Sequence, residues 1–343
     1  MLANGAGAAV ALGERECSIQ RRHQKVLEES PSPALDPELR GRMSAAALAF
    51  ARAVGYRSAG TVEFMLDGRD FFLLELNGRI QVEHPVTELV TGIDLVREQL
   101  RIAAGDSILP SNNLFHGHAV EVRLYAEDPR TFLPQGGRIQ RLRLPDAIRV
   151  DPGVEEGDDV GLAYDPLIAK LIAYGPTRAD ALDRLRGALD ETEVEGVVTN
   201  LPFLRWLVSH PALRAGETTT VFLVDHPPLS RPPAALPAGP WRGAWRLNLP
   251  TPAPVSPPDL ETAARDHGVS AEQSALTAPM PGIVVKVLVS AGDQVAARQS
   301  LVVLEAMKME TPVVSPYDAV VRAVHVAEGD RVAGGALLVE LEE

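Results

Sequence analysis

The sequence predicts the α+β fold class, in the order of a mixed α/β region, a proline-rich linker and a small all-β domain. Three observations lead to the predicted order of a first folded region, a linker and an all-β domain. Residues 60–88 contain β-prone runs around a turn signal, residues 226–259 are about one-third proline, and the segment that follows repeats short Val/Leu runs. Long proline-rich stretches cannot form regular structure, so they mark the boundary between two folded parts.

The composition limits the classes of function. At 343 residues and 45% hydrophobic content, the chain can form two or three domains with separate cores. Its net charge of -13 disfavours nucleic-acid binding, which needs clustered Lys and Arg. The chain has no run of 18 apolar residues and no basic segment before an apolar one, so we predict neither a membrane span nor a secretory signal. One cysteine, Cys17, permits no internal disulfide, and we predict a cytoplasmic protein.

Residues 60–88 read GTVEFMLDGRDFFLLELNGRIQVEHPVTE and predict a β-hairpin around Asp67 and Gly68. The second run alternates between polar and apolar residues, so one face of the predicted strand carries Glu75, Asn77, Arg79, Gln81 and Glu83. A solvated edge strand alternates in the same way, and the pattern alone leaves both interpretations open. Carboxylates and an amide oxygen suit a hard cation, however, and an arginine suits an oxyanion, which favours a binding site.

The turn decides whether Glu63 joins this face. A two-residue turn at Asp67 and Gly68 would put Glu63 and Glu75 on opposite faces of the hairpin. A common face requires one more residue in the loop, or a bulge. We predict a three-residue loop over residues 67–69, in which Glu75 faces Thr61 and Glu63 is its diagonal neighbour.

The segment after about residue 271 contains an internal repeat of 37 residues. The shift aligns Pro279 with Pro316, Val287 with Val324, Gly292 with Gly329, Asp293 with Asp330, Val295 with Val332, and Leu304 with Leu341. Two similar β units therefore form one small domain. Lys308 falls between the two halves, at an exposed turn.

Lysine is rare in this chain: there are only four, Lys25, Lys170, Lys286 and Lys308. Lys308 lies between Met307 and Met309 at the predicted turn, where apolar side chains contribute little to stability. A lysine amine can be acylated, so this context favours recognition or modification over packing.

The sequence EAMKME around Lys308 resembles the biotin attachment motif of biotin carboxyl carrier domains. APMPG at residues 278–282 and the two-fold repeat also resemble that family. Lipoyl domains share the fold but usually carry Asp before the lysine and Ala after it, so the methionines favour biotin. Ala319 departs from the family, which usually has Gly there.

Upstream, four segments in the family's order resemble the biotin carboxylases: CSIQRRHQKV, AGTVEF, LELNGRIQVEHPVTE and GHAVEVRLYAEDP. The resemblance implies the C-terminal half of an ATP-grasp domain at residues 1–115 and a biotin carboxylase C-terminal α+β domain at 116–225. It also implies the Pro-rich linker at 226–271 and a biotinyl domain, a barrel-sandwich hybrid, at 272–343.

Roles follow for the matching residues as implications of the resemblance. Three residues would hold the Mg²⁺ or Mn²⁺ ions that bridge ATP phosphates: Glu63, Glu75 and Asn77. Arg79 would orient bicarbonate, Glu83 would act as its base, and Arg123 would stabilise the enolate formed on biotin. The neighbours of bicarbonate and biotin would include Gln81 and Val82. Groups near the nucleotide, phosphate or bicarbonate would be Gln20, His23, Gln24 and Lys25. The chain has Gly78 where relatives usually have Thr or Pro, which should loosen the strand.

Simpler interpretations stay open for some of these residues. His23 suits an ordinary surface position, and Arg123 suits a strand arginine paired with Glu121. His84 precedes Pro85 and is expected to shape the chain. The family's interface and packing positions match Asp165 and Lys170, which we leave out of the site.

The resemblance implies the α-type subunit of an acyl-CoA carboxylase, with biotin on Lys308 and ATP and bicarbonate as substrates. Its partners would be a carboxyltransferase β subunit and a biotin protein ligase, within an oligomer. The glycine-rich phosphate loop of the family does not occur in these residues. We therefore expect a chain that begins inside a domain and is inactive alone. The alternative is a non-catalytic biotinylated carrier.

Overall fold

The structure is a computed structural model that describes residues 1–21, 24–106, 115–130, 132–161, 164–228, 275–306 and 309–342. His23, Lys308 and most of the predicted linker lie outside the described residues. The chain divides into two compact units, Met1–Pro228 and Leu229–Glu343, and each is described by itself. Among the described residues, no helix is both long and apolar enough to cross a membrane.

The first unit begins with a small three-stranded sheet in the order β2-β1-β6. Its strands are β1 (Leu2–Asn4), β2 (Ala9–Val10) and β6 (Arg57–Ala59), and its helices are α1 (Pro37–Ala53) and α3 (Leu95–Ala104). Both helices start behind an aspartate: the Asp36 carboxylate accepts a hydrogen bond from the Leu39 amide, and the Asp94 carboxylate accepts one from the Arg97 amide. Apolar side chains from β1, β6 and α3 share one core.

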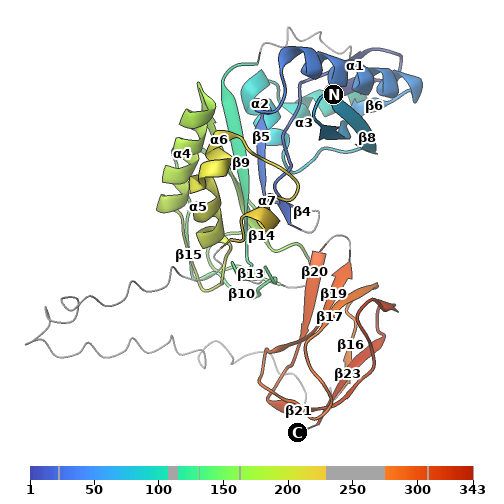
Figure 1. Cartoon of the computed structure of the whole chain (residues 1–343), viewed down its shortest axis with the longest axis vertical. Coiled ribbons are helices and arrows are strands. Elements are labelled where there is room, and N and C mark those ends of the chain that lie inside the picture. The colour runs from blue at the N-terminus through green and yellow to red at the C-terminus, as the bar shows by residue number, and fades with distance from the viewer. Residues whose placement is uncertain are drawn as a thin grey trace, which may run out of the picture. The chain divides into compact units, whose positions relative to one another are not determined.

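The centre of the first unit is a four-stranded antiparallel sheet in the order β12-β14-β9-β5. Its strands are β5 (Leu27–Ser30), β9 (His118–Tyr125), β12 (Arg149–Pro152) and β14 (Leu167–Gly175). All residues of β9 are buried. Helices α4 (Arg178–Glu191) and α5 (Leu201–Ser209) lie along one face, and α2 (His84–Thr91) contacts the other (Figure 1). The sheet therefore has no solvent face at β9, where charged residues must find partners.

Several short elements complete this unit. The pairs of strands are β3 (Gln20–Arg21) with β4 (Gln24–Lys25), β10 (Gly137–Arg138) with β13 (Asp159–Val160), and β11 (Arg141–Arg143) with β15 (Glu193–Glu195). Two short helices follow, α6 (Pro211–Ala215) and α7 (Phe222–Asp225).

The predicted hairpin forms from β7 (Thr61–Asp67) and β8 (Asp70–Asn77), but its predicted register is wrong. Asp67 pairs with Asp70, so the turn has two residues, and Thr61 faces Asn77 instead of Glu75. A register shift next to Glu63, as in a β-bulge, inserts the extra residue within the strands. Glu63 therefore faces Glu75 directly, and the common face arises from the bulge that we considered as the alternative.

The predicted strand also ends early. β8 stops at Asn77, residues 78–83 form a loop, and α2 begins at His84. Gly78 interrupts the strand, while Pro85 in the first turn suits a helix start. Alternation in sequence did not distinguish a strand from this loop. Because β8 ends at Asn77, Gln81 and Glu83 reach the site from a loop and not from one strand face.

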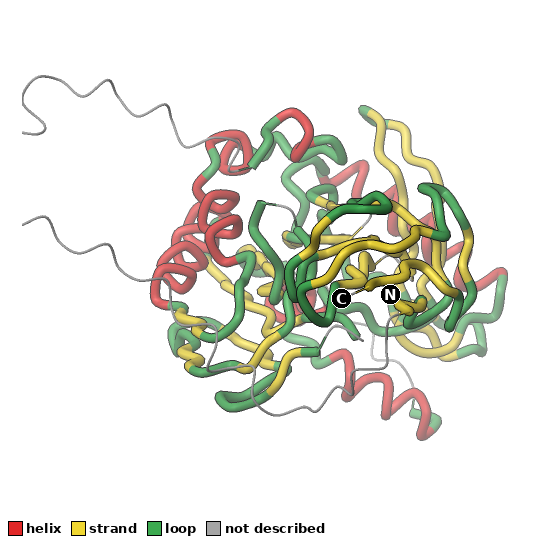
Figure 2. The backbone as a smooth tube through the Cα atoms, turned by 90° about the horizontal axis from the view of Figure 1, so that it is seen from below, coloured by secondary structure: helices red, strands yellow, loops and turns green. Residues whose placement is uncertain are grey.

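The second unit confirms the repeat. In the described part it contains strands and loops and no helix (Figure 2). One sheet has the order β16-β23-β21-β18, with β16 (Ala275–Thr277), β18 (Gln294–Val295), β21 (Ala319–Val324) and β23 (Leu337–Glu342). The other has the order β20-β19-β17-β22, with β17 (Gly282–Val287), β19 (Ser300–Ala306), β20 (Met309–Val314) and β22 (Arg331–Val332). Each strand has its repeat in the opposite sheet, as for β17 and β21.

The repeat extends to the turns and the core. Gly292 and Gly329 have φ of 95° and 92°, a region that favours glycine. The next residue in each repeat, Asp293 or Asp330, accepts a 2.8 Å hydrogen bond from a backbone amide three residues before it. Equivalent apolar residues fill one core between the sheets: Val284 and Val321, Leu301 and Leu338, and Leu304 and Leu341.

Strands β19 and β20 form the hairpin that connects the two repeats. Their last pair is Ala306 with Met309, so only Met307 and Lys308 lie between the strands. Those two residues are outside the described part of the chain. The sequence position of Lys308, between two paired strands, agrees with the predicted junction of the repeats.

Candidate functional site

A cavity of about 360 Å³ opens in the first unit next to the β7–β8 hairpin. Its polar end contains Lys25, Glu63, Gln81 and Glu83, and its apolar part includes Met43, Met65 and Leu74. Gln20 also lines it. The cavity therefore combines charged groups with an apolar surface.

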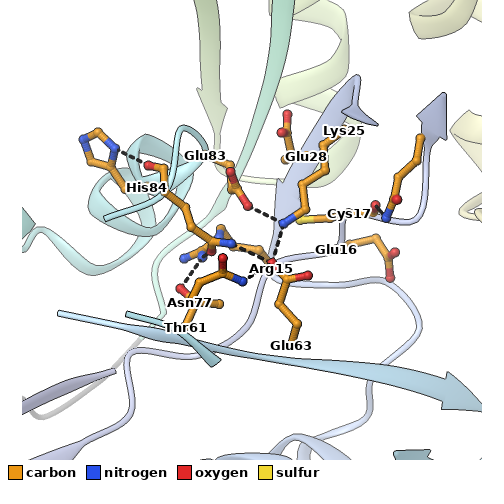
Figure 3. Close-up of polar contacts among 12 residues, drawn as sticks. Arg15, Glu16, Cys17, Lys25, Glu28, Thr61, Glu63, Asn77, Glu83 and His84 are labelled. Atoms are coloured by element: carbon orange, nitrogen blue, oxygen red, sulfur yellow. Dashed lines mark hydrogen bonds and ion pairs between the residues drawn. The ribbon is translucent and has the colours of Figure 1, made fainter. Parts of the chain in front are cut away.

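Lys25 connects two carboxylates in this cavity. Its Nζ lies 2.8 Å from Glu63 Oε1 and 2.6 Å from Glu83 Oε1 (Figure 3). Burial alone would lower the pKa of Lys25, but the two carboxylates outweigh it and hold the pKa above its ordinary value. Lys25 is therefore positively charged at neutral pH.

Glu83 is buried, at the position before α2, and it binds two cations. One oxygen accepts from Lys25, and the other lies 3.0 Å from Nη2 of Arg123. Burial would raise the pKa of Glu83, but Arg15, Lys25 and Arg123 lower it to about 2. The carboxylate is thus ionised at neutral pH. Its proton affinity would rise if Lys25 and Arg123 interacted with a different anion, and Glu83 would then be a stronger base.

Two residues of this network were missed in the sequence. Arg15 donates to Thr87 at 3.0 Å, to Thr61 at 2.9 Å and to Gln81. Glu28 is fully buried on β5 and accepts from Nε of Arg123 at 2.8 Å. No local signal marks Arg15. For Glu28, adjacent acids within the apolar-flanked run VLEES would have suggested a buried carboxylate.

The three predicted metal ligands lie together. Glu63 faces Glu75 across the hairpin, and Nδ2 of Asn77 lies 3.1 Å from Glu63 Oε1 and 3.0 Å from Glu75 Oε1. Gln81 donates to the same Glu63 oxygen at 2.6 Å. No described group contains three or more His, Cys, Asp or Glu side chains arranged to hold a metal ion.

These ligands nevertheless fit a small, hard cation, because they supply two carboxylates and one amide. The Asn77 amide would have to turn so that its oxygen, in place of Nδ2, faces the carboxylates. Glu63, Glu75 and Asn77 would then present oxygen atoms to Mg²⁺ or Mn²⁺.

Other predicted site residues lie at the margin of this network. Arg79 is exposed, and its Nη1 donates to the Ile80 carbonyl at 3.1 Å. Gln24 pairs with Arg21 across the β3–β4 hairpin. His84 contacts the Gln81 carbonyl through Nδ1 at 2.9 Å, which agrees with a role in shaping the chain.

Lys170, which we left out of the site, contacts it directly. Its Nζ donates to the Val82 carbonyl at 3.2 Å and pairs with Asp151 at 2.9 Å. The alternative that pairs Arg123 with Glu121 is wrong. Arg123 binds Glu28 and Glu83, and neither carboxylate oxygen of Glu121 has a hydrogen-bond partner among the described residues.

Glu127, near this site, gives a testable pH dependence. Burial is the main cause that raises its pKa to about 7, although Arg21, 3.6 Å away, opposes it. Between the unfolded pKa, ordinarily 4.5, and about 7, the folded protein binds more protons, so stability falls as pH rises. We expect Glu127→Gln to remove this loss, worth at most about 3 kcal/mol. Urea unfolding at pH 5 and pH 8 measures it.

The exposed Glu217→Gln change is the control, since it also removes one carboxylate. The free energy of unfolding of Glu127→Gln, relative to the parent, should increase from pH 5 to pH 8. An equal difference at both pH values would contradict the prediction.

Comparison with known families supports the resemblance over all three folded parts. Residues 1–110 match the family described as carbamoyl-phosphate synthase L chain, ATP binding domain. Residues 121–225 match the biotin carboxylase C-terminal domain, and residues 274–341 match the family described as biotin-requiring enzyme.

Relatives agree with these matches. A propionyl-CoA carboxylase alpha chain of Ruegeria pomeroyi is 49% identical over 254 residues, which are 66% of this chain and 37% of that protein. A biotin carboxylase of Halalkalibacterium halodurans is 50% identical over 225 residues, 64% of this chain and 50% of the relative. The chain spans about half, or less, of the length of these curated relatives.

A solved structure shows the same fold. It is titled as the biotin carboxylase domain of a thermophilic 2-oxoglutarate carboxylase bound to bicarbonate. The TM-score is 0.64 at 43% identity, over 66% of this chain and 52% of that one. With ATP-grasp, biotin carboxylase C-terminal and biotinyl domains in one polypeptide, this chain belongs to the biotin-dependent carboxylases.

Proposed function

We propose that residues 1–225 handle bicarbonate and ATP phosphates in an ATP-dependent biotin carboxylase, and that the second unit carries biotin on Lys308. The observation that supports this most directly is the chain of contacts Glu63–Lys25–Glu83–Arg123, of which the first three residues line the cavity. It brings a candidate metal ligand, a candidate base and two cations together. Such a site can bind anions and move a proton.

In this proposal, Glu83 accepts the proton of bicarbonate. Its low pKa opposes this while Lys25 and Arg123 neutralise it. Bicarbonate bound near those two cations would share their charge and so strengthen Glu83 as a base. Arg79, Gln81 and Val82 would orient the anion, and Gln20, His23 and Gln24 would lie toward the nucleotide.

Glu63, Glu75 and Asn77 would hold the Mg²⁺ or Mn²⁺ ion, which when bound would neutralise phosphate charge. Bicarbonate would attack the terminal phosphate of ATP, with ADP as the leaving group. Biotin, when attached, would supply the nitrogen that accepts the carboxyl group, with inorganic phosphate as the leaving group. Arg123 would then stabilise the negative charge that develops on the acceptor. The chain's own contributions to these steps would be the metal ligands and the Arg123 guanidinium.

The second unit would deliver the carboxyl group to another protein. We propose a biotin protein ligase as the enzyme that modifies Lys308, and a carboxyltransferase β subunit that transfers the carboxyl group to an acyl-CoA. The named relatives include carboxylases of propionyl-CoA and of 2-oxoglutarate, so the acyl acceptor is part of the proposal. We further propose that the assembly is oligomeric and cytoplasmic.

Bicarbonate-dependent ATP turnover with free biotin tests this function. We would compare residues 1–343 with the same chain extended upstream through a glycine-rich phosphate loop. We expect turnover near background for the short form, and turnover in the long form that Glu83→Gln abolishes. An extended chain that accepts biotin but never hydrolyses ATP would favour the non-catalytic carrier.

The metal ligands should act as a unit. In the extended chain, Glu75→Gln should weaken binding of magnesium with a non-hydrolysable nucleotide by about tenfold or more, because a charged ligand is lost. Calorimetry measures the affinity. Asp67→Asn removes the same charge at the tip of the same hairpin and should have little effect. Equal affinities for Glu75→Gln and Asp67→Asn would mean that the Glu75 carboxylate is not a ligand.

A further inference from the structure

Two acidic residues face each other in the middle of the central sheet. Glu28 on β5 pairs in register with Glu121 on β9, and both side chains are fully buried, with 0% exposed. Residues directly opposite on antiparallel strands have Cβ atoms about 4.5–5.5 Å apart. Two negative charges at such a distance, away from water, would strongly repel each other.

The two carboxyl groups differ in their partners. Glu28 accepts hydrogen bonds at Oε1 from Nε and Nη2 of Arg123, which also reaches Glu83, while its Oε2 has no partner in the part of the chain that the structure describes. Burial raises the pKa of Glu28, and Arg123 opposes that rise. Both oxygens of Glu121 lack a hydrogen-bond partner within the described ranges. An ionised carboxylate without any donor would be very costly there, whereas a neutral acid would cost much less.

The other charged groups around Glu121 do not compensate it. Glu28 and Glu83 repel a charge on Glu121, while Arg123 and Lys170 attract it. Arg123 pairs with Glu28 and Glu83, and Lys170 pairs with Asp151 at 2.9 Å. Burial first, and then Glu28, raises the pKa of Glu121 well above its usual range.

We propose that Glu121 is a positioning residue that stays a neutral carboxylic acid, so that the pair's single negative charge remains on Glu28 and holds Arg123 against Glu83. The link to catalysis rests on the proposed function, in which Arg123 and Glu83 act together. The protonation of Glu121 does not rest on it, because it concerns the resting chain.

The consequence concerns Arg123. If Glu121 ionised, two carboxylates on neighbouring strands would compete for one guanidinium, and the contact with Glu83 would weaken. A neutral Glu121 removes that competition. Glu28 is then the only charged partner of Arg123 on the sheet, and its two bonds fix the direction of the guanidinium plane.

Infrared spectroscopy of the full chain with carbon-13-labelled glutamate tests the protonation. The parent should be Glu127→Gln, because Glu127 also has a raised pKa and would contribute a signal. We expect a carbonyl band of a protonated acid at pH 8, lost when Glu121→Gln is added. Absence of the band in the parent, or its persistence in Glu121→Gln, would overturn the proposal.

A second measurement tests positioning. The Nε–H signal of Arg123, followed by nitrogen-15 NMR, should shift in the parent over the pH range in which the acid band disappears. In Glu121→Gln it should stay constant, because no charge can form there. The same shift in both proteins would overturn the positioning role. If Glu121→Gln does not fold, the parent protein alone still tests the positioning role. In the parent, the loss of the acid band and the shift of the Arg123 signal must then occur at the same pH.

Glu28→Gln provides the reverse test. Removing the charge opposite Glu121 and freeing Arg123 should lower the pH at which the acid band is lost. An unchanged or higher value would show that Glu28 does not control the proton on Glu121. None of these measurements needs turnover, so their failure can be distinguished from failure of the proposed enzyme.

Discussion

Replacing Lys308 by arginine should abolish covalent attachment of biotin to this chain. Arginine keeps the positive charge but has no amine that forms an amide under these conditions. The substitution removes the ε-amine to which biotin would be attached, so we expect a complete loss of labelling. Co-expression with a biotin protein ligase, followed by intact mass measurement, should show one added biotin in the parent and none in Lys308→Arg.

Lys286→Arg is the matched control, because Lys286 is an exposed lysine on β17 of the same unit. It should be labelled as fully as the parent. Label that persists in Lys308→Arg would show that the ligase uses another amine. A loss of label in Lys286→Arg as well would mean that the unit itself, and not the attachment residue, had been damaged.

The second large effect should come from Arg178, which connects α4 to the central sheet. Its guanidinium binds Glu29 at 2.6 and 2.9 Å and also donates to the carbonyls of Leu213 and Arg214. Glu29 is fully buried and also binds Nε2 of His118 at 2.7 Å. Burial alone would raise the pKa of Glu29, but these hydrogen bonds lower it, so Glu29 carries a charge.

We expect Arg178→Met to lower the free energy of unfolding of the first unit by about 3–5 kcal/mol, because it leaves a buried charge without its main partner. Urea unfolding followed by circular dichroism measures it. Arg186→Met is the control, since Arg186 is exposed on the same helix. Similar losses in the two variants would show that helix propensity, and not the Glu29 pair, causes the effect.

The second unit shows how much the sequence can determine by itself. Its 37-residue repeat predicted two equivalent β units, and each strand has its counterpart in the opposite sheet. The same alignment placed Lys308 at the junction, where β19 and β20 meet. Local patterns suffice here because each strand, turn glycine and core residue occurs twice at a fixed spacing.

The hairpin shows where sequence patterns fail. Alternation correctly put Glu75 and Asn77 on one face, but it predicted a strand continuing to Glu83. Glu63 was placed beside them through a predicted three-residue turn, whereas the structure has a two-residue turn and a register shift next to Glu63. A bulge and a long loop can produce the same side-chain facing, and alternation does not distinguish them. The structure thus brings the three predicted ligands together although the backbone that carries them was predicted wrongly.

Only the tertiary structure revealed the charge network. Arg15, Glu28 and Lys170 meet Gln81, Arg123 and the Val82 carbonyl from segments that are 66, 95 and 88 residues away in sequence. The sequence determined which residues are acidic, basic or apolar, and hence the family and the small domain. The fold decided which charges lie together without water, and in that environment the partners of each group set its protonation.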